Sequence, residues 1–352
     1  MTRDTILGWL LIFLVGASLF LSFFIWYQTP GPMQGELTQV NDAKLDLASV
    51  LGPEKIQVRF GDSTHTLLRP SSSYYSEVWS LSRELLTDQW SNVGLEALED
   101  SWWRKQGVVA NFPTPLPVSA LRKLVDAKPV ETSSLEGKLI RSFIMTIEDE
   151  KLVAYLEDDG GNFHKFSKHG DPQALKALLK ELANSRPPLY ARLPSEGKNL
   201  IISNQVYVSL LSYELPAYSL GEEAPPGERQ VSEYFSDFSV VRKIEEKDGA
   251  VIYTDGQRGL RVYEDGAIEY SFPGDSEAGK CDFYDSLMSV VNFVNRHGGW
   301  PKNVYLASYE KLEAGKYAFR FRVRINGYPL VGGEDFLTVE VTDTRISRLH
   351  RR

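Results

Sequence analysis

The stretch Tyr317–Ile325, YAFRFRVRI, alternates two kinds of residue without a break and decides the fold class. Aromatic or β-branched residues occupy every second position from Tyr317, and Ala318 and three arginines occupy the positions between them. Successive side chains of a strand point to opposite faces of a sheet, so this stretch predicts a strand with one buried face. Asn326-Gly327, directly after it, is a typical turn and ends the strand.

Outward from this strand, further strands and helices follow one another irregularly. Asp255-Gly256 and Asp265-Gly266 separate apolar runs, which is typical of hairpins. Amphipathic stretches between the groups of strands predict helices. The expected strands cover 56–60, 64–68, 139–147, 151–157, 163–166, 200–207, 250–254, 259–263, 267–272, 317–325 and 336–342, and the expected helices cover 73–89, 119–125, 172–186, 231–237 and 282–296. This order predicts an α+β fold with antiparallel sheets.

One segment is expected to be neither helix nor central strand. Phe112–Pro117, FPTPLP, has a proline at every second position. Proline lacks the backbone N–H that an inner strand needs, and it breaks the interior of a helix. We therefore expect an extended connector here.

Composition excludes several classes of protein. The 352 residues carry 39 Lys and Arg against 47 Asp and Glu, a formal net charge of -8. Nucleic-acid-binding proteins usually have a basic excess, so no nucleic-acid partner is expected. An apolar fraction of 42% suffices for packed cores and argues against a disordered chain. Cys281 is the one cysteine, which excludes an internal disulfide and a four-thiolate metal site.

The N-terminal region predicts a single-pass anchor in the cell membrane. No charged residue occurs between Thr5 and Gly35. A helix over Ile6–Tyr27 would be about 33 Å long, close to the thickness of the hydrocarbon core. A cleaved signal peptide would have a shorter apolar run with small residues at its exit, whereas this run ends in Trp26-Tyr27. Because Arg3 and the terminal amine precede the helix, we expect the N-terminus in the cytoplasm.

The length after the anchor allows roughly two domains of about 100–200 residues each. We expect a cytoplasmic stub at 1–5, the anchor at 6–27 and a polar tether at 28–50. Two extracytoplasmic α+β domains follow, at 51–193 and at 194–352. Pro187-Pro188 closes the last helix before this boundary.

The anchor also presents a seam on which a second membrane helix could pack. Small residues on such a seam allow two backbones to approach closely in lipid, where packing drives association. The seam residues, at alternating spacings of three and four, are Gly8, Leu11, Val15, Ser18, Ser22 and Ile25. The alternative is that they are ordinary residues of a lipid-facing anchor.

The residues show no recognisable catalytic machinery. Gly61-Asp62-Ser63 is similar to the nucleophile block of GDS-type hydrolases, but that class needs a late Asp-x-x-His to activate the serine. His65 is the one histidine with an aspartate three residues before it, and that aspartate belongs to the same turn. A hairpin turn is therefore the preferred interpretation.

Two other chemical readings remain alternatives. Asp158-Asp159 with His164 and His169 could form a metal cluster, but their spacing matches no metal motif, so a solvated acidic turn is preferred. A glycosidase pair depends on a separation in three dimensions and stays open. The adjacent carboxylates that could supply it are Glu222-Glu223, Glu245-Glu246 and Glu334-Asp335. We predict no catalytic residue, no cofactor and no metal.

Two further features allow both a structural and a functional interpretation. Arg320, Arg322 and Arg324 share one face of the predicted strand. They could bind an anionic ligand or partner, but a solvated sheet face is the preferred interpretation. Trp102-Trp103 could be an exposed contact, although core burial is the more frequent fate of tryptophan pairs.

Several segments together resemble the YycH family of two-component regulatory proteins. The anchor Leu11–Tyr27 with its following Thr-Pro resembles the N-terminus of that family, and the chain is short for it. The other matching segments are Phe112–Leu121 (FPTPLPVSAL), Val251–Phe272 (VIYTDGQRGLRVYEDGAIEYSF), Asn295–Trp300 (NRHGGW) and Phe319–Leu330 (FRFRVRINGYPL). The related YycI proteins share the plan of an anchor and a surface domain and are the nearest alternative.

The resemblance implies a regulator and not an enzyme. Such proteins associate with a sensor histidine kinase of the WalK (YycG) type and with YycI, through membrane helices and extracytoplasmic domains, and so affect cell-wall homeostasis. The resemblance supplies no catalytic residues. The alternative function is an anchored extracytoplasmic ligand-binding protein or cell-wall enzyme.

Overall fold

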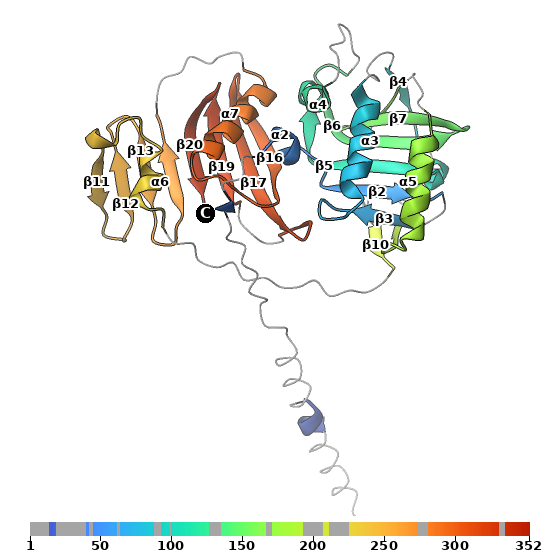
Figure 1. The fold of residues 1–352 in the computed structure, drawn as a ribbon, viewed down its shortest axis with the longest axis horizontal. Coiled ribbons are helices and arrows are strands. Elements are labelled where there is room, and N and C mark those ends of the chain that lie inside the picture. The colour runs from blue at the N-terminus through green and yellow to red at the C-terminus, as the bar shows by residue number, and fades with distance from the viewer. Residues whose placement is uncertain are drawn as a thin grey trace, which may run out of the picture. The chain divides into compact units, whose positions relative to one another are not determined.

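Two antiparallel sheets of nine strands each organise the chain (Figure 1). The computed structural model describes residues 14–18, 40–41, 45–61, 64–87, 93–98, 100–126, 135–166, 171–192, 207–210, 225–273, 281–330 and 335–352. Both sheets belong to one unit, Gln39–Ser212 together with Glu223–Arg352. The predicted α+β class with antiparallel sheets is confirmed.

The first sheet has the strand order β10-β9-β3-β2-β5-β6-β7-β8-β4. Its strands are β2 (Lys55–Arg59), β3 (Thr64–Leu68), β4 (Val93–Glu96), β5 (Gly107–Pro117), β6 (Leu139–Glu148), β7 (Lys151–Asp158), β8 (Phe163–Phe166), β9 (Tyr190–Arg192) and β10 (Tyr207–Ser209). The helices that accompany it are α3 (Tyr75–Thr87), α4 (Val118–Leu124) and α5 (Gln173–Asn184). In Figure 1, α3 and α5 lie across the same face of this sheet.

The two faces of the first sheet bury separate sets of side chains. Val108 and Ala110 of β5 belong to the large core that also holds the apolar faces of α3 and α5. Val109, between them, belongs to a smaller core with Trp102 and Trp103. These tryptophans lie on the 3-10 helix η1 (Asp100–Arg104) and are buried. The interpretation of Trp102-Trp103 as core residues is confirmed.

The second sheet has the order β11-β12-β13-β14-β20-β19-β17-β16, and β18 pairs with β17. Its strands are β11 (Arg242–Glu245), β12 (Val251–Thr254), β13 (Gly259–Val262), β14 (Ile268–Ser271), β16 (Val304–Glu313), β17 (Lys316–Ile325), β18 (Tyr328–Pro329), β19 (Leu337–Thr342) and β20 (Arg345–Arg351). The strand predicted at 317–325 is confirmed as β17. Phe319 and Phe321 of β17 are fully buried.

Helix α7 (Phe283–Arg296) supplies the apolar cover of the second sheet. Its buried face carries Phe283, Leu287, Val290, Val291 and Val294. The ring of Phe283 lies 5.6 Å from that of Phe319 in a T-shaped arrangement. The Asp282 side chain accepts a hydrogen bond from the Asp285 N–H and caps the helix, as its sequence position favours.

Three short elements complete this part of the chain. They are α6 (Glu228–Ser232), the 3-10 helix η2 (Phe238–Val240) and β15 (Trp300–Pro301). The helix expected at 231–237 begins earlier and ends earlier, as α6.

The prediction of a connector at 112–117 was wrong, because β5 continues through Pro117. Strand β5 pairs with β6 up to Asn111, shifts register and pairs again at Leu116 and Pro117. Pro113 and Pro115 lie between Asn111 and Leu116, where β5 does not pair with β6, so no backbone N–H is needed there for the ladder. The prolines therefore interrupt the pairing without ending the strand.

The region predicted as the tether is structured in its last part. Strand β1 (Val40–Asn41) pairs with β15, and α2 (Leu47–Val50) buries Leu47 and Val50 in the large core. At the other boundary, β10 pairs with β9 of the first sheet although it follows residue 193. The chain thus contributes to folded structure before residue 51 and to the first sheet after residue 193. The domain limits themselves stay predictions.

Within the residues that the structure describes, no helix has the length and apolar character needed to cross a membrane. Most of the anchor predicted at 6–27 lies outside the described residues, where only 14–18 are placed, as a helical segment. The anchor and its orientation therefore stay predictions.

Candidate functional site

The predicted partner face of the anchor lies almost entirely outside the described residues. Val15 and Ser18 belong to the helical segment 14–18, and both are exposed. Gly8, Leu11, Ser22 and Ile25 are not described. The partner face stays a prediction.

Asp158 and His164 form a buried polar pair, so the solvated turn preferred for Asp158 was wrong. The Asp158 carboxylate accepts a hydrogen bond from the Asn162 N–H at 2.8 Å, and its Oδ2 lies 3.0 Å from His164 Nε2. Burial raises the pKa of Asp158, but hydrogen bonds from His164, Asn162 and Lys138 outweigh it and hold the pKa well below its usual range. The pair fastens the turn between β7 and β8.

No group of three or more metal-binding side chains occurs in the part of the chain that the structure describes. Asp62, Ser63 and His169 lie outside that part. Among the adjacent carboxylates, Glu246 pairs with Arg261 and Asp335 pairs with Arg322. Glu246 and Asp335 therefore both take part in ion pairs.

The three arginines of β17 have different surroundings. Arg322 Nε donates to Asp335 Oδ1 at 2.7 Å, and Arg320 Nε lies 3.9 Å from Asp335 Oδ2. Their side chains are 42% and 43% exposed, as expected for a solvated sheet face. Arg324 is only 4% exposed, so for this residue the solvated interpretation was wrong.

Arg324 lies against an aromatic ring and lines a cavity of about 390 Å³. Its Cζ is 3.8 Å from the centroid of Tyr305 of β16. Burial lowers the pKa of its guanidinium, although the nearby Tyr305, Tyr75 and Glu54 oppose the shift. The group is charged at neutral pH because arginine starts from so high a pKa.

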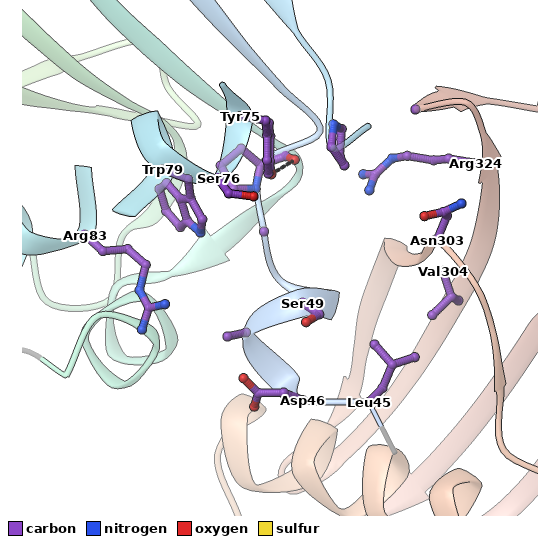
Figure 2. A pocket seen from close by; sticks show the side chains of 15 residues that line it. Leu45, Asp46, Ser49, Tyr75, Ser76, Trp79, Arg83, Asn303, Val304 and Arg324 are labelled. Atoms are coloured by element: carbon purple, nitrogen blue, oxygen red, sulfur yellow. Dashed lines mark hydrogen bonds between the residues drawn. The ribbon is translucent and has the colours of Figure 1, made fainter. Parts of the chain in front are cut away.

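The cavity is lined by four parts of the chain, one of which is the start of β16 with Asn303 and Val304. Helix α2 and the following loop supply Gly52 and Pro53, α3 supplies Trp79 and Tyr75, and β17 supplies Arg324. Figure 2 shows Arg324 extending from β17 toward the wall that carries Tyr75. The remaining lining residues are Leu45, Asp46, Ala48, Ser49, Pro70, Ser76, Arg83 and Gly327.

Tyr75 is fixed in the wall opposite Arg324. Its hydroxyl donates a hydrogen bond to the Pro53 carbonyl at 2.6 Å. Burial raises the pKa of Tyr75 far above its usual value, although the positive charge of Arg324 opposes the shift. The hydroxyl therefore stays neutral, and its one proton is already donated. The cavity thus combines a buried cation with apolar and polar walls, an arrangement that can bind a small molecule.

A second cavity, of about 560 Å³, lies beside α7 and is lined by aromatic rings and arginines. His297 Nδ1 lies 2.6 Å from the Phe293 carbonyl, and burial lowers the pKa of this histidine. Arg258 and Arg345 lie over the ring of Phe272, with each Cζ within about 5.3 Å of its centroid. The guanidinium groups of Arg258 and Arg345 therefore each make a cation–π contact with Phe272.

The segment that follows the predicted anchor is bonded to the second sheet and its helix. The Leu45 N–H donates to Asn295 Oδ1 at 3.0 Å, and Asn295 Nδ2 donates back to the Leu45 carbonyl at 3.2 Å. Strand β1 pairs with β15 just before this contact. From Leu45 the chain continues through α2 into β2 of the first sheet.

Sequence reasoning grouped Arg324 with Arg320 and Arg322 and missed Tyr75, Trp79 and Tyr305. The alternation of β17 places all three arginines on one face. No pattern in the sequence indicates that α2 and α3 cover only the last of them. Aromatic residues at helical spacing on α3 signal a core face as readily as a cavity wall.

Comparison with known proteins supports the fold. No model of a protein family matches the chain, and none of the curated proteins matches it. Among solved structures, the crystal structure of YycH from Bacillus subtilis matches with a TM-score of 0.60 and 13% sequence identity. The match covers 88% of this chain and 82% of that chain. At this identity the likeness shows the fold alone, and for the fold it confirms the resemblance to YycH.

Proposed function

We propose that this chain is a membrane-anchored regulator of a sensor histidine kinase of the WalK (YycG) type. It acts outside the cytoplasmic membrane, together with a YycI-like protein, and affects cell-wall homeostasis. The observation that carries the proposal is the fold shared with YycH over 88% of the chain. The ordered sequence segments that resemble the same family support it further.

The attachment of the N-terminal segment supports a mechanical role. Strand β1 pairs with β15, Leu45 bonds to Asn295 of α7, and the chain then enters the first sheet through α2 and β2. A displacement of the membrane helix would pull on this segment. Its load would reach both sheets through hydrogen bonds and through the buried Leu47 and Val50. Regulation of this kind needs contacts and movement, not a catalytic group or a cofactor.

A second candidate is an anchored protein that binds a small extracytoplasmic ligand. The cavity beside the buried Arg324 favours it. The two functions are compatible, because a ligand that stabilises one arrangement of a regulator shifts its population.

Co-purification from membranes tests the regulatory proposal. The full chain is expected to retain the kinase, and a chain whose residues 1–30 are replaced by an unrelated single-pass anchor is expected to retain less. The replacement keeps membrane attachment, so it separates attachment from specific contact. If the full chain fails to retain the kinase under conditions in which the kinase retains its other membrane partners, the regulatory proposal is wrong.

A further inference from the structure

We propose that the cavity between α3 and β17 binds the carboxylate group of a small organic molecule, with Arg324 as its anchor. This site does not depend on the proposed kinase partner. The argument uses the burial of Arg324, the atoms of its guanidinium that lack partners, and the groups that hold it in place.

The guanidinium of Arg324 carries a buried edge without partners. Among the residues that the structure describes, neither Nε nor Nη2 has a hydrogen-bond partner, and both atoms are inaccessible to solvent. These two nitrogens lie on the same edge of the guanidinium, where their N–H bonds run nearly parallel. This edge matches the two oxygens of one carboxylate.

A buried arginine without a partner is unfavourable, and this one differs from its neighbours. Charged groups in protein interiors are normally paired, because desolvation is otherwise uncompensated. Arg322, two residues earlier, has Asp335 at 2.7 Å. Glu54 is close enough to influence the pKa of Arg324, but no ion pair joins these two described residues. An anionic ligand would supply the missing carboxylate.

The guanidinium of Arg324 is held in place before any ligand arrives. The ring of Tyr305 supports the guanidinium face at 3.8 Å, and the backbone N–H of Arg324 donates to the Asn303 carbonyl at 3.1 Å. Stacking occupies the face of the guanidinium and leaves its edge without a partner, and a carboxylate reaches this edge once the side chains that exclude solvent from it move aside. Figure 2 shows the guanidinium directed into the cavity and not back along β17.

The other walls define the ligand class. Trp79 and Pro53 offer apolar surface for an organic body, and about 390 Å³ is the size of a small-molecule site. The Tyr75 hydroxyl cannot also donate a hydrogen bond to a ligand oxygen, because it already donates to the Pro53 carbonyl. A phosphate dianion would need more donors than one guanidinium edge provides, whereas a carboxylate monoanion is matched by it. The lining also contains Arg83 and Asp46, whose opposite formal charges offset each other, so the preference for an anion rests on Arg324.

Titration calorimetry on the full chain in detergent tests the site, with sodium benzoate as the probe. Benzamide is the neutral analogue of the same shape, and inorganic phosphate is the competing oxyanion. We expect saturable binding of benzoate, no binding of benzamide, and weaker binding of phosphate. Arg324→Met should weaken benzoate binding by about tenfold or more, since it removes a charged, two-point hydrogen bond. Arg320→Met, on the same strand but exposed, should bind like the parent.

Thermal unfolding without ligand gives a second, independent readout. Because Arg324→Met removes a buried charge that lacks a partner, it should leave the melting temperature unchanged or raise it. Arg324→Lys keeps the charge but loses the parallel N–H pair, so it should fold and bind benzoate several-fold more weakly.

Three results would overturn the proposal. The first is the absence of saturable benzoate binding, and the second is equal binding by the parent and Arg324→Met. The third is a fall of several degrees in the melting temperature of both Arg324 variants, which would mean that the guanidinium has a structural partner. Tighter binding of phosphate than of benzoate would contradict the ligand class.

Discussion

Lys123 Nζ, at the end of α4, lies 3.1 Å from both Asp282 Oδ2 and Asp285 Oδ1, in the first turn of α7. The lysine follows β5 of the first sheet, and the aspartates begin the helix that covers the second sheet. Burial opposes the charge of Lys123, but the hydrogen bonds that it donates to both aspartates outweigh burial and raise its pKa. Asp282 also caps α7, so one carboxylate fastens the helix start and receives the lysine.

Lys123→Met should lower the free energy of unfolding by about 0.5–1 kcal/mol, because all three side chains are partly exposed and solvent screens the pairs. The effect should shrink at high salt. Lys180→Met, at an exposed position of α5, is the matched control. Urea unfolding at low and high salt measures both variants, and a salt-independent loss would contradict an ionic origin.

Glu148 should make stability depend on pH below about 4.5. Burial raises its pKa, but hydrogen bonds from Lys105, Trp102, Lys165 and Tyr155 outweigh it and lower the pKa from 4.5 to about 2. A lowered pKa means that the stabilisation is complete above pH 4.5 and is lost as the pH falls toward about 2.

Glu148→Gln should therefore lower stability at neutral pH by on the order of 2 kcal/mol and flatten the pH dependence in that window. The neighbouring Glu150→Gln, at an exposed turn, should retain the parent's profile. Denaturant unfolding at several pH values distinguishes them. Parallel profiles for the parent and Glu148→Gln would show that other carboxylates dominate acid unfolding.

Gly107→Ala should destabilise the first sheet by about 3 kcal/mol, because β5 has no room for a methyl group there. A Cβ at Gly107 would lie 2.2 Å from the Met145 carbonyl oxygen, and backbone cannot move aside as a flexible side chain can. Gly94→Ala, on β4, meets nothing within 4 Å and is the control. Thermal melts of both variants check the prediction, and a similar small effect of the two would contradict it.

Residues 36–352 should fold without the predicted anchor. The unit formed by Gln39–Ser212 and Glu223–Arg352 contains both sheets and their cores. The truncated chain is expected to be soluble and to melt in a cooperative transition. An aggregated product, or one without a cooperative melt, would mean that the membrane segment is needed for folding.

The seam of the predicted anchor should matter for the kinase, if the proposed function is right. Ser18→Leu with Ser22→Leu should weaken kinase association in a membrane two-hybrid assay, because bulky residues keep two helices apart. Phe13→Leu with Phe20→Leu lies off the seam and remains equally apolar, so it controls for insertion. Equal association of both double variants would leave the helix with an anchoring role alone.

The strands with unbroken alternation or clear turn chemistry were predictable, whereas two long strands whose ladders contain register shifts were not. Strand β17 and the hairpins β12 to β14 match the sequence prediction. Strands β16 and β20 were missed, because register shifts break their period, between Leu306 and Ser308 in one pair and between Glu340 and Val341 in the other. A bulge moves later side chains to the other face, so period-two reasoning fails there.

The candidate cavity was only partly predictable for a related reason. The sequence indicates that Arg320, Arg322 and Arg324 share one face of a strand. Whether that face is covered depends on α2 and α3, which are far away in sequence. Local pattern therefore gave the position of Arg324 on the strand but not its burial.

The reciprocal bonds between Leu45 and Asn295 join residues 250 positions apart. When a chain emerges from a ribosome or a translocation channel, this contact cannot form until the 250 residues from Leu45 to Asn295 have emerged. In the same way, β1 cannot pair until β15 has emerged. Val40, Asn41 and Leu45 thus become fixed only after most of the chain has been made. A chain stalled before α7 would present this segment unattached to quality-control proteases, which act on such unfastened ends.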